Sequence, residues 1–307
     1  MKKTVVNKKI KIVVTGGAGF IGSHLVDALV NKGFNVQAID NLSTGRREQV
    51  NKKAKLHVLD VINLKSIEPV FKNAKYVFHL AALPSVQYSL EQPQITNEVN
   101  VGGTVNVLAA AQKAKVKKVI YSSSSAVYGS QKIKRLKESA LILPVSPYGL
   151  QKYLGELYCR LWSELYGLPT VALRYFNVYG PHQSDKGAYA SVIAKFLKQL
   201  SQNQPLTITG DGRQTRDFVN VKDIVRANIL AMNSRRVGRG EAINIGGGNS
   251  YSVARIAQVI GGTVVHIPPR LEPKHSLADI TLARQLLNWR PTIALTEGIE
   301  ELKYEIQ

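Results

Sequence analysis

Two groups of polar residues in this chain have the types and the spacing to move a proton. Tyr148 and Lys152 are four residues apart, which places both side chains on one face of a helix, a turn apart. A free phenol has a pKa of about 10 and is a poor base at neutral pH, but a neighbouring ammonium favours the phenolate. The serines at 122–125 end an apolar segment and could place a hydroxyl beside the same substrate oxygen. Together these residues predict an acid–base site.

A glycine-rich turn near the start of the chain predicts a second piece of chemistry. Gly16, Gly19 and Gly22 directly follow the apolar segment Ile10–Val14. Glycines at such a turn allow a sharp bend and a close approach of the backbone to a pyrophosphate, and the amides that open the next helix favour negative charge. An ordinary strand-to-helix turn can also be rich in glycine. Its place between a predicted strand and a predicted helix favours dinucleotide binding.

The acid at the end of the second predicted strand bears on which dinucleotide binds. Asp40 can accept hydrogen bonds from the adenosine ribose hydroxyls and would repel a 2′-phosphate, which favours NAD over NADP. The alternative is that Asp40 only forms a turn with Asn41. Asp60, after the third predicted strand, is in a similar position to contact the adenine.

The elements that must position these residues alternate in the first half of the chain. Short Val- and Ile-rich segments are separated by amphipathic ones such as Phe20–Lys32 and Val99–Ala114, a rhythm typical of βαβ units. The predicted strands are Ile10–Val14, Val36–Ile39, Leu56–Leu59, Tyr76–Leu80, Val119–Ser122 and Thr170–Leu173. They predict an α/β fold with a Rossmann-like, doubly wound parallel sheet.

After about residue 175 the rhythm changes to shorter elements, which predicts a smaller C-terminal α/β substrate lobe. A helix near Ala188–Gln202, strands at Leu206–Thr209 and Ala242–Ile245 and a helix at Asp279–Asn288 are expected there. We expect residues 1–175 to form the NAD-binding Rossmann domain, with residues 217–246 returning to it. Residues 176–307 would form most of the substrate lobe.

Composition excludes several classes of function. The net charge of +20 comes from lysines and arginines that are scattered and not interleaved with aromatic residues, so we expect no nucleic-acid binding. No apolar stretch has the length of a membrane span, and we expect no signal peptide. The single cysteine, Cys159, fits a reducing, cytoplasmic location. His79 and His266 are expected to be structural, and no residues have metal-ligand spacing.

Several motifs taken together resemble the extended short-chain dehydrogenase/reductase family over nearly the whole chain. They are TGGAGFIG at 15–22, DNL at 40–42, HLAA at 79–82, SSAVYG at 124–129, Tyr148-x-x-x-Lys152, RYFNVYGP at 174–181 and GDGRQTRDF at 210–218. Within the family the chain is most similar to NAD-dependent nucleotide-sugar 4-epimerases of the UDP-glucose/UDP-N-acetylglucosamine type.

The resemblance implies a role for each matching position. Tyr148 would be the acid/base, Lys152 would hold the nicotinamide ribose, and Ser124 would bind the reacting hydroxyl. NAD would contact Gly16, Gly19, Phe20, Ile21, Gly22, Asp40, Asn41, Asp60, Val61, Leu80, Ala81, Ala82, Asn100, Ser122, Tyr148, Lys152 and Tyr175. The UDP-sugar would contact Pro84, Ser85, Ser124, Tyr148, Asn177, Ser191, Val192, Thr207, Arg216, Arg270 and Ser276. Asn177 and the two arginines would meet its diphosphate.

The same resemblance narrows the reaction. Related 4,6-dehydratases carry an Asp-Glu pair where this chain has Ser125 and Ala126, and the acid of the uronate decarboxylases is missing from the same segment. Among these reactions, the resemblance therefore implies epimerisation at carbon 4 of the sugar through a transient 4-keto intermediate. Ser276 stands where a bulky tyrosine restricts relatives to glucose and galactose. A small residue there implies UDP-GlcNAc and UDP-GalNAc as substrates, with UDP-Glc and UDP-Gal also accepted.

Other functions stay open beside this one. The nearest is another extended nucleotide-sugar enzyme, a uronate epimerase or a net oxidoreductase. A more remote one is an NAD-sensing or nucleic-acid-binding protein on the same fold. The resemblance also implies a homodimer through the Val99–Ala114 and Tyr148–Leu165 helices, although their apolar faces suit burial within one chain as well.

Overall fold

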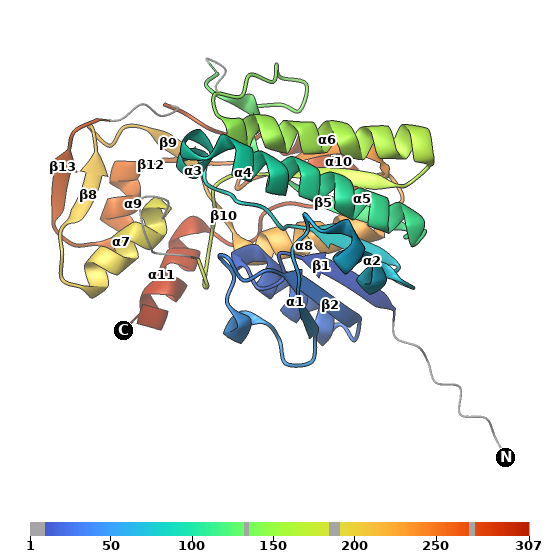
Figure 1. The fold of residues 1–307 in the computed structure, drawn as a ribbon. Helices are drawn as coiled ribbons and strands as arrows, with labels where there is room; N and C mark the ends of the chain where they lie inside the picture. Colours follow the sequence, from blue (N-terminus) through green and yellow to red (C-terminus); the bar gives the residue numbers. More distant parts are fainter. Residues whose placement is uncertain (1–9, 132–134, 184–190, 270–273, 307) are drawn as a thin grey trace.

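The computed structural model describes residues 10–131, 135–183, 191–269 and 274–306 (Figure 1). Arg270, which was predicted to contact a diphosphate, lies outside the described residues.

A seven-stranded parallel sheet forms the centre of the molecule, which confirms the predicted Rossmann-like fold. Its strands, in the order β11-β6-β5-β4-β1-β2-β3, are β1 (Lys11–Thr15), β2 (Asn35–Asp40), β3 (Lys55–Val58), β4 (Tyr76–His79), β5 (Lys118–Ser124), β6 (Thr170–Tyr175) and β11 (Arg239–Ile245). The first six match the predicted strands to within one or two residues. The seventh, β11, pairs along the whole length of β6.

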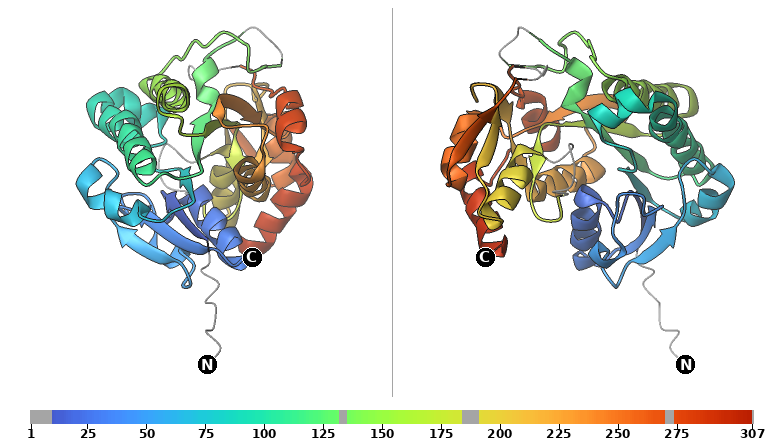
Figure 2. Two further views of the ribbon diagram at one scale, coloured as in Figure 1. Left: turned by 90° about the vertical axis from the view of Figure 1, so that its right-hand side faces the viewer. Right: turned by 60° about the vertical axis from the view of Figure 1, so that its left-hand side comes forward.

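Helices cover both faces of this sheet (Figure 2). They are α1 (Phe20–Asn31), α8 (Val221–Asn233) and α10 (Thr281–Leu287) on one face, and α2 (Leu64–Phe71), α5 (Gly103–Lys113) and α6 (Pro147–Tyr166) on the other. Alternate strand residues point to opposite faces, so Ile12 and Val14 join one core whereas Val13 joins the other. Burial on both faces explains why these strands are continuously apolar.

The segment between β4 and β5 contains more elements than the single helix predicted at 99–114. It contains α3 (Val86–Glu91), α4 (Pro93–Asn97), a π-helical turn (Glu98–Gly102) and then α5. The π turn holds Asn100, whose buried side chain bonds to the backbone of Leu83. The widened turn thus places a polar side chain inside the fold, which a pattern of apolar residues cannot reveal. Short 3-10 helices cover Arg47–Gln49 and Ser125–Tyr128.

Shorter elements make up the rest of the described chain. They are α7 (Val192–Ser201), α9 (Val253–Ile260), α11 (Leu295–Ile306) and three strand pairs: β7 (Val178–Tyr179) with β10 (Val219–Asn220), β8 (Leu206–Thr209) with β13 (Val264–Ile267), and β9 (Thr215–Asp217) with β12 (Ser250–Ser252). Of these, α7, α9, α11, β7, β8 and β12 contribute to a third apolar core. The strand at 206–209 matches its prediction. The last predicted helix is shorter than expected, since α10 begins at Thr281 and ends at Leu287.

Candidate active site

The glycine turn lies between β1 and α1 and has the geometry that a pyrophosphate needs. Gly16 has a φ of +70°, and a Cβ there would come within 2.7 Å of the backbone nitrogen of Ala81. Gly19 caps α1 without a side-chain hydrogen bond, and the first turn of α1 holds no acidic residue. The amides of Phe20, Ile21 and Gly22 therefore meet no competing carboxylate from their own turn. These features fit an anionic dinucleotide.

Asp40 is nine-tenths buried at the end of β2 and holds the turn in place. One carboxylate oxygen accepts the N–H of Ala18 at 2.9 Å and the other accepts the N–H of Leu42 at 2.8 Å. Each oxygen keeps a second lone pair, so the carboxylate can still accept a ribose hydroxyl. Asn41 donates to Asp60 at 2.7 Å, which couples two of the predicted adenosine contacts.

Three further predicted cofactor residues, Leu80, Ala81 and Ala82, directly follow the carboxyl end of β4. The backbone of Leu80 donates to the Thr15 carbonyl, and the N–H of Ala81 reaches the Thr15 hydroxyl. This places the segment 80–82 directly beside Gly16. Asn100 bonds to the backbone of Leu83, the next residue of the chain, and donates to Gln151 on α6 at 2.8 Å. Asn100 therefore joins this segment to α6. Val61, near the other end of the predicted site, packs against Gly103.

The predicted catalytic pair, Tyr148 and Lys152, lies on the first turns of α6. Ser146 caps this helix by accepting the N–H of Gly149 at 3.1 Å, and Pro147 occupies a first-turn position where no N–H is needed. Lys152 donates to the carbonyl of Ser122 at 2.8 Å. Its Nζ lies 6.0 Å from the centroid of the Tyr148 ring. The structure therefore brings α6 and the end of β5 together around one lysine.

The protein's own groups act on the two pKa values in opposite ways. Burial raises the pKa of Tyr148 to about 12, and a hydrogen bond with Ser124 opposes this rise. Burial lowers the pKa of Lys152 to about 8. The expectation that Lys152 would lower the tyrosine pKa is thus not met by these groups alone, because desolvation of the phenol dominates. The positive charge of an oxidised nicotinamide would act in the required direction.

Ser122 and Tyr175, also predicted at the cofactor, lie on the neighbouring strands β5 and β6, where Tyr175 pairs with Ser124. Ser122 pairs with Leu173 in the sheet, and its hydroxyl shares a hydrogen bond with the Tyr175 phenol. Asn228 on α8 holds the same phenol at 2.8 Å. Tyr175 is therefore fixed from both sides.

Three predicted substrate residues gather where β6 and β9 end. Asn177 donates to the carbonyl of Asp217 at 2.9 Å and lies 3.4 Å from the hydroxyl of Ser276. Arg216 precedes Asp217 on β9 and donates to the Thr215 carbonyl at 3.0 Å. Asn177, Arg216 and Ser276 therefore occupy one cluster, as a site for a single diphosphate-linked sugar would require.

The other predicted substrate residues lie at the ends of helices or in the 206–209 strand. Ser85 caps α3, and Pro84 precedes it. Ser191 caps α7, which begins with Val192. Thr207 exchanges two hydrogen bonds with Gln199 of α7.

Three buried ionisable residues that the sequence analysis did not single out lie close to the predicted site, and burial raises the pKa of one of them, Asp217, to about 7. The carboxylate of Asp217 accepts backbone N–H groups from Gly247, Gly248 and Ala278, so it joins three segments behind Asn177 and Ser276. Glu156 and Arg174 form an ion pair between α6 and β6. A charged residue inside an otherwise apolar strand, as Arg174 is, was the available signal, because such a group needs a buried partner.

Two kinds of feature are absent from the described residues. No three His, Cys, Asp or Glu side chains among them lie close enough together to hold a metal ion. None of the helices in the described ranges combines the length and the apolar character needed to span a bilayer.

Comparisons with known proteins agree with this geometry. Residues 12–246 match the model of the NAD dependent epimerase/dehydratase family. A putative UDP-glucose 4-epimerase of Methanocaldococcus jannaschii is 40% identical over 300 residues, which cover 95% of this chain and 96% of the relative.

Two solved structures are similar throughout. The UDP-glucose 4-epimerase of Thermotoga maritima, determined with UDP-glucose, is 37% identical with a TM-score of 0.92, over 97% of this chain and 100% of that one. The UDP-N-acetylglucosamine 4-epimerase of Methanobrevibacter ruminantium, in complex with UDP-N-acetylmuramic acid, is 39% identical with a TM-score of 0.91, over 97% and 99% of the two chains. This chain therefore belongs to the NAD-dependent epimerase/dehydratase family and is an NAD-dependent enzyme.

Proposed function

We propose that this enzyme is a UDP-sugar 4-epimerase that interconverts UDP-GlcNAc and UDP-GalNAc and also accepts UDP-Glc and UDP-Gal. The observation that carries the reaction type is the group formed by Tyr148, Lys152 and Ser124. In the sequence, Ser124 is followed by Ser125 and Ala126. The end of β5 therefore offers no carboxyl group that could help to eliminate water or carbon dioxide from the sugar.

The residues act in sequence on the 4-hydroxyl of the sugar. The chemistry that NAD supplies is the reversible acceptance of a hydride from carbon 4. Tyr148 takes the hydroxyl proton, and Ser124 holds the same oxygen through its hydrogen-bonding hydroxyl. Lys152, anchored on the Ser122 carbonyl, carries a positive charge beside the phenol. Tyr148 then returns the proton after the 4-keto sugar has turned its other face.

The substrate's remote diphosphate keeps that intermediate from leaving. Arg216 and Asn177 would bind it, since a guanidinium forms charge-assisted bonds with phosphate oxygens. Arg270 would join them from outside the described residues. Binding energy from the nucleotide is thereby used to hold a sugar that must rotate.

The size of residue 276 supports the hexosamine substrate. The Ser276 hydroxyl lies 3.4 Å from the Asn177 amide, so the side chain at this position borders the predicted diphosphate contact. A serine leaves space for an N-acetyl group, whereas a tyrosine would fill it. Similar proteins include a UDP-N-acetylglucosamine 4-epimerase at 39% identity and a UDP-glucose 4-epimerase at 37%, which is compatible with acceptance of both sugar pairs.

A panel of nucleotide sugars, assayed without added NAD, tests the proposal. We expect turnover of both the acetylated and the non-acetylated pair. Ser276→Tyr should lower kcat/KM for UDP-GlcNAc at least about tenfold while UDP-Glc is retained, since steric exclusion of one group is worth about 1–3 kcal/mol. Ser276→Ala is the matched control, because it removes only the bond to Asn177 and should leave the preference unchanged.

Tyr148→Phe should lower kcat by about 10²- to 10⁴-fold without unfolding the protein. Turnover of UDP-glucuronate alone, or release of NADH with a stable keto product, would contradict the proposal in favour of its nearest rivals. The expected homodimer and cytoplasmic location stay predictions.

A further inference from the structure

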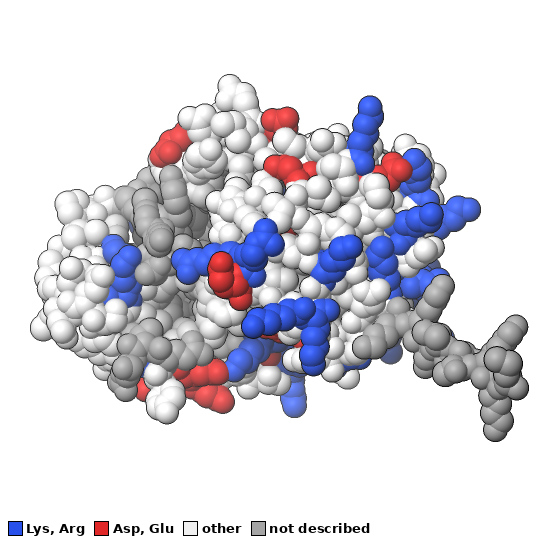
Figure 3. Space-filling model, turned by 60° about the horizontal axis from the view of Figure 1, so that its bottom comes forward, with Lys and Arg blue, Asp and Glu red and all other residues white. Residues whose placement is uncertain are grey.

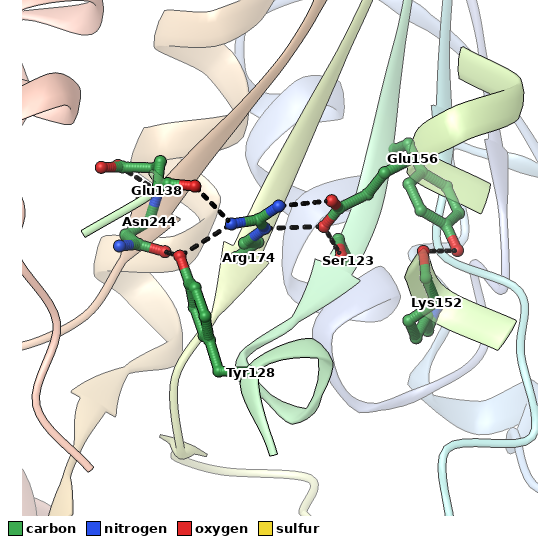
Figure 4. Close-up of polar contacts among 8 residues, drawn as sticks. Ser123, Tyr128, Glu138, Lys152, Glu156, Arg174 and Asn244 are labelled. Carbon is green, nitrogen blue, oxygen red and sulfur yellow. Dashed lines mark hydrogen bonds and ion pairs between the residues drawn. The ribbon is translucent and has the colours of Figure 1, made fainter. Parts of the chain in front are cut away.

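A buried ion pair lies on the same face of α6 as the catalytic residues. Glu156 follows Lys152 by one helical turn and Tyr148 by two. Its two carboxylate oxygens accept Nε and Nη2 of Arg174 at 2.8 and 2.7 Å, a bidentate pairing (Figure 4). Both side chains are 5% exposed. The pair therefore joins the catalytic helix to β6 away from water.

Hydrogen bonds extend this pair to the catalytic strand. The hydroxyl of Ser123 donates to the Glu156 carboxylate (Figure 4). Ser123 stands between Ser122, whose carbonyl anchors Lys152, and Ser124. Glu156 thus bonds to the residue that stands between Ser122, a predicted NAD contact, and Ser124, a predicted substrate contact.

The same guanidinium is held from the other side. Arg174 Nη1 donates to the Tyr128 phenol at 2.8 Å, and that phenol donates to Asn244 on β11 at 2.7 Å. The Glu138 carbonyl accepts the same Nη1 at 3.3 Å. The position of the Glu156 carboxylate is therefore set by β5, β6 and β11 together.

The charges that surround Lys152 make Glu156 important for its protonation. Burial lowers the pKa of Lys152, and Cys159 and Glu156 oppose this. Burial also raises the pKa of the Cys159 thiol, so that group is neutral at physiological pH and Glu156 supplies the negative charge. The groups facing Lys152 from other elements are Tyr121 on β5 and His79 on β4. Both are neutral near pH 7, because burial raises the pKa of Tyr121 and lowers that of His79 to about 3.

Stability alone is a weak reason for such a pair. Burying two charges removes them from water, and an apolar pair of similar volume is often as stable or more so. We propose that Glu156, held by Arg174, is a positioning residue for the epimerase reaction: it fixes Ser122–Ser124 and Lys152 relative to Tyr148 and keeps Lys152 cationic. This inference rests on the proposed function for its assay.

Glu156→Gln tests the charge with the shape retained. The amide oxygen can still accept from Ser123 and Arg174, but the negative charge is gone. We expect kcat to fall about 10- to 100-fold, as for a misaligned catalytic group. The alkaline limb of the kcat–pH profile should move to lower pH, because Lys152 then loses its proton more easily. KM for the nucleotide sugar should change little, since Glu156 does not contact substrate.

Three variants separate positioning from general stability. Glu156→Asp keeps the charge, so its alkaline limb should stay at the wild-type pH although kcat falls. The double variant Glu156→Leu/Arg174→Met removes both charges at similar volume and should fold, yet it should keep the low kcat and the shifted limb. Asp223→Asn removes another buried carboxylate that pairs with an arginine, Arg226 on α8. It should lower Tm while leaving kcat and the pH profile unchanged.

A readout without substrate separates this inference from the proposed function. NMR titration of the lysine side chains, with Lys152 assigned through Lys152→Met, should show a lower pKa in Glu156→Gln and the wild-type value in Glu156→Asp. If no UDP-sugar is turned over but this shift appears, the proposed function fails and the role of Glu156 in holding the lysine charge stands. Wild-type kcat, pH profile and Lys152 titration in both Glu156→Gln and the double variant would overturn the inference.

Discussion

At the scale of single residues, His79 shows how the fold holds a titratable group neutral. The imidazole lies at the end of β4 and is 1% exposed. Its Nδ1 is 2.7 Å from the Thr15 hydroxyl, and its Nε2 is 2.9 Å from that of Thr104. The ring thus joins β1, β4 and α5 directly beneath the predicted dinucleotide turn. Burial, and to a lesser extent the charge of Lys152, lowers its pKa to about 3.

Acid should therefore destabilise the protein through His79. The unfolded histidine takes up a proton near pH 6.5, whereas the folded one does so only near pH 3. Between these two pH values the unfolded state binds more protons than the folded state. The contribution of His79 to the free energy of unfolding is therefore fully present above pH 6.5 and is lost as the pH falls. From pH 7 to pH 5 this group should remove about 2 kcal/mol from the free energy of unfolding.

Urea unfolding of wild type and His79→Gln at both pH values measures this contribution. The stability difference between the two proteins should shrink by that amount at pH 5. A difference between wild type and His79→Gln that is the same at both pH values would contradict the prediction.

The predicted catalytic residues show which part of the site was readable from the sequence. The spacing of Tyr148 and Lys152 and the place of the serine cluster at a strand end could be read directly. The depth of burial could not, and burial is what sets the pKa of Tyr148 to about 12. Glu156 and Arg174 could not be paired either, because their contact depends on how α6 crosses β6.

At the scale of elements, one glycine determines how closely α6 lies on the sheet. Gly155 stands in the middle of this helix, one turn after Gln151 and directly over Tyr121 of β5. A Cβ at Gly155 would collide with the Tyr121 hydroxyl. The phenol also donates to the Lys152 carbonyl at 3.4 Å. The helix can therefore bring Lys152 to Ser122 only because residue 155 has no side chain.

Gly155→Ala should lift α6 from β5. We expect a loss of about 1–3 kcal/mol in the free energy of unfolding, as for other overpacked cores, together with a lower kcat. Gly102→Ala is the matched control, since a Cβ there meets no atom within 4 Å and its backbone is already helical. That change should be neutral or stabilise by up to about 1 kcal/mol. Equal effects of the two substitutions, measured by thermal unfolding, would refute this account.

Element boundaries show the same limit of sequence reasoning. Residues of the segment 99–114 are apolar at helical spacing throughout, so a continuous helix was the natural prediction. The π turn arises because Asn100 bonds Leu83 and Gln151, two residues that come near it only in the folded chain. Tertiary contacts of this kind leave no local pattern.

At the scale of the whole molecule, basic residues gather at one edge of the parallel sheet. All seven strands begin at one edge, where Lys11, Lys55, Lys118 and Arg239 are the first residues of their strands. The helices that connect parallel strands end at this edge, where cations complement the helix dipole. Lysine and arginine side chains spread over the face drawn in Figure 3, with fewer acidic ones among them. Part of the basic composition thus has a structural reason.

The repulsion between like charges at this edge should be measurable through the pKa of a nearby histidine, His57. Burial lowers the pKa of His57, and Lys55 and Lys11 lower it further. Lys55→Gln should therefore raise the His57 pKa toward its ordinary value, and added salt should raise it in wild type more than in the variant. Lys53→Gln, at an exposed neighbour, should have little effect. Ring-proton NMR titration gives the values, and an unchanged His57 in Lys55→Gln would disprove the coupling.

The order in which the strands occur along the chain also affects folding during translation. A ribosome releases residues from the amino end, so β6 emerges long before β11, its outer neighbour. Until then β6 presents unpaired peptide groups and apolar side chains, a template for unwanted strand addition between nascent polypeptides. Asn244 reaches Tyr128 only when β11 docks. The growing polypeptide is thus an expected client of chaperones, and its enzymatic competence arises near the end of translation.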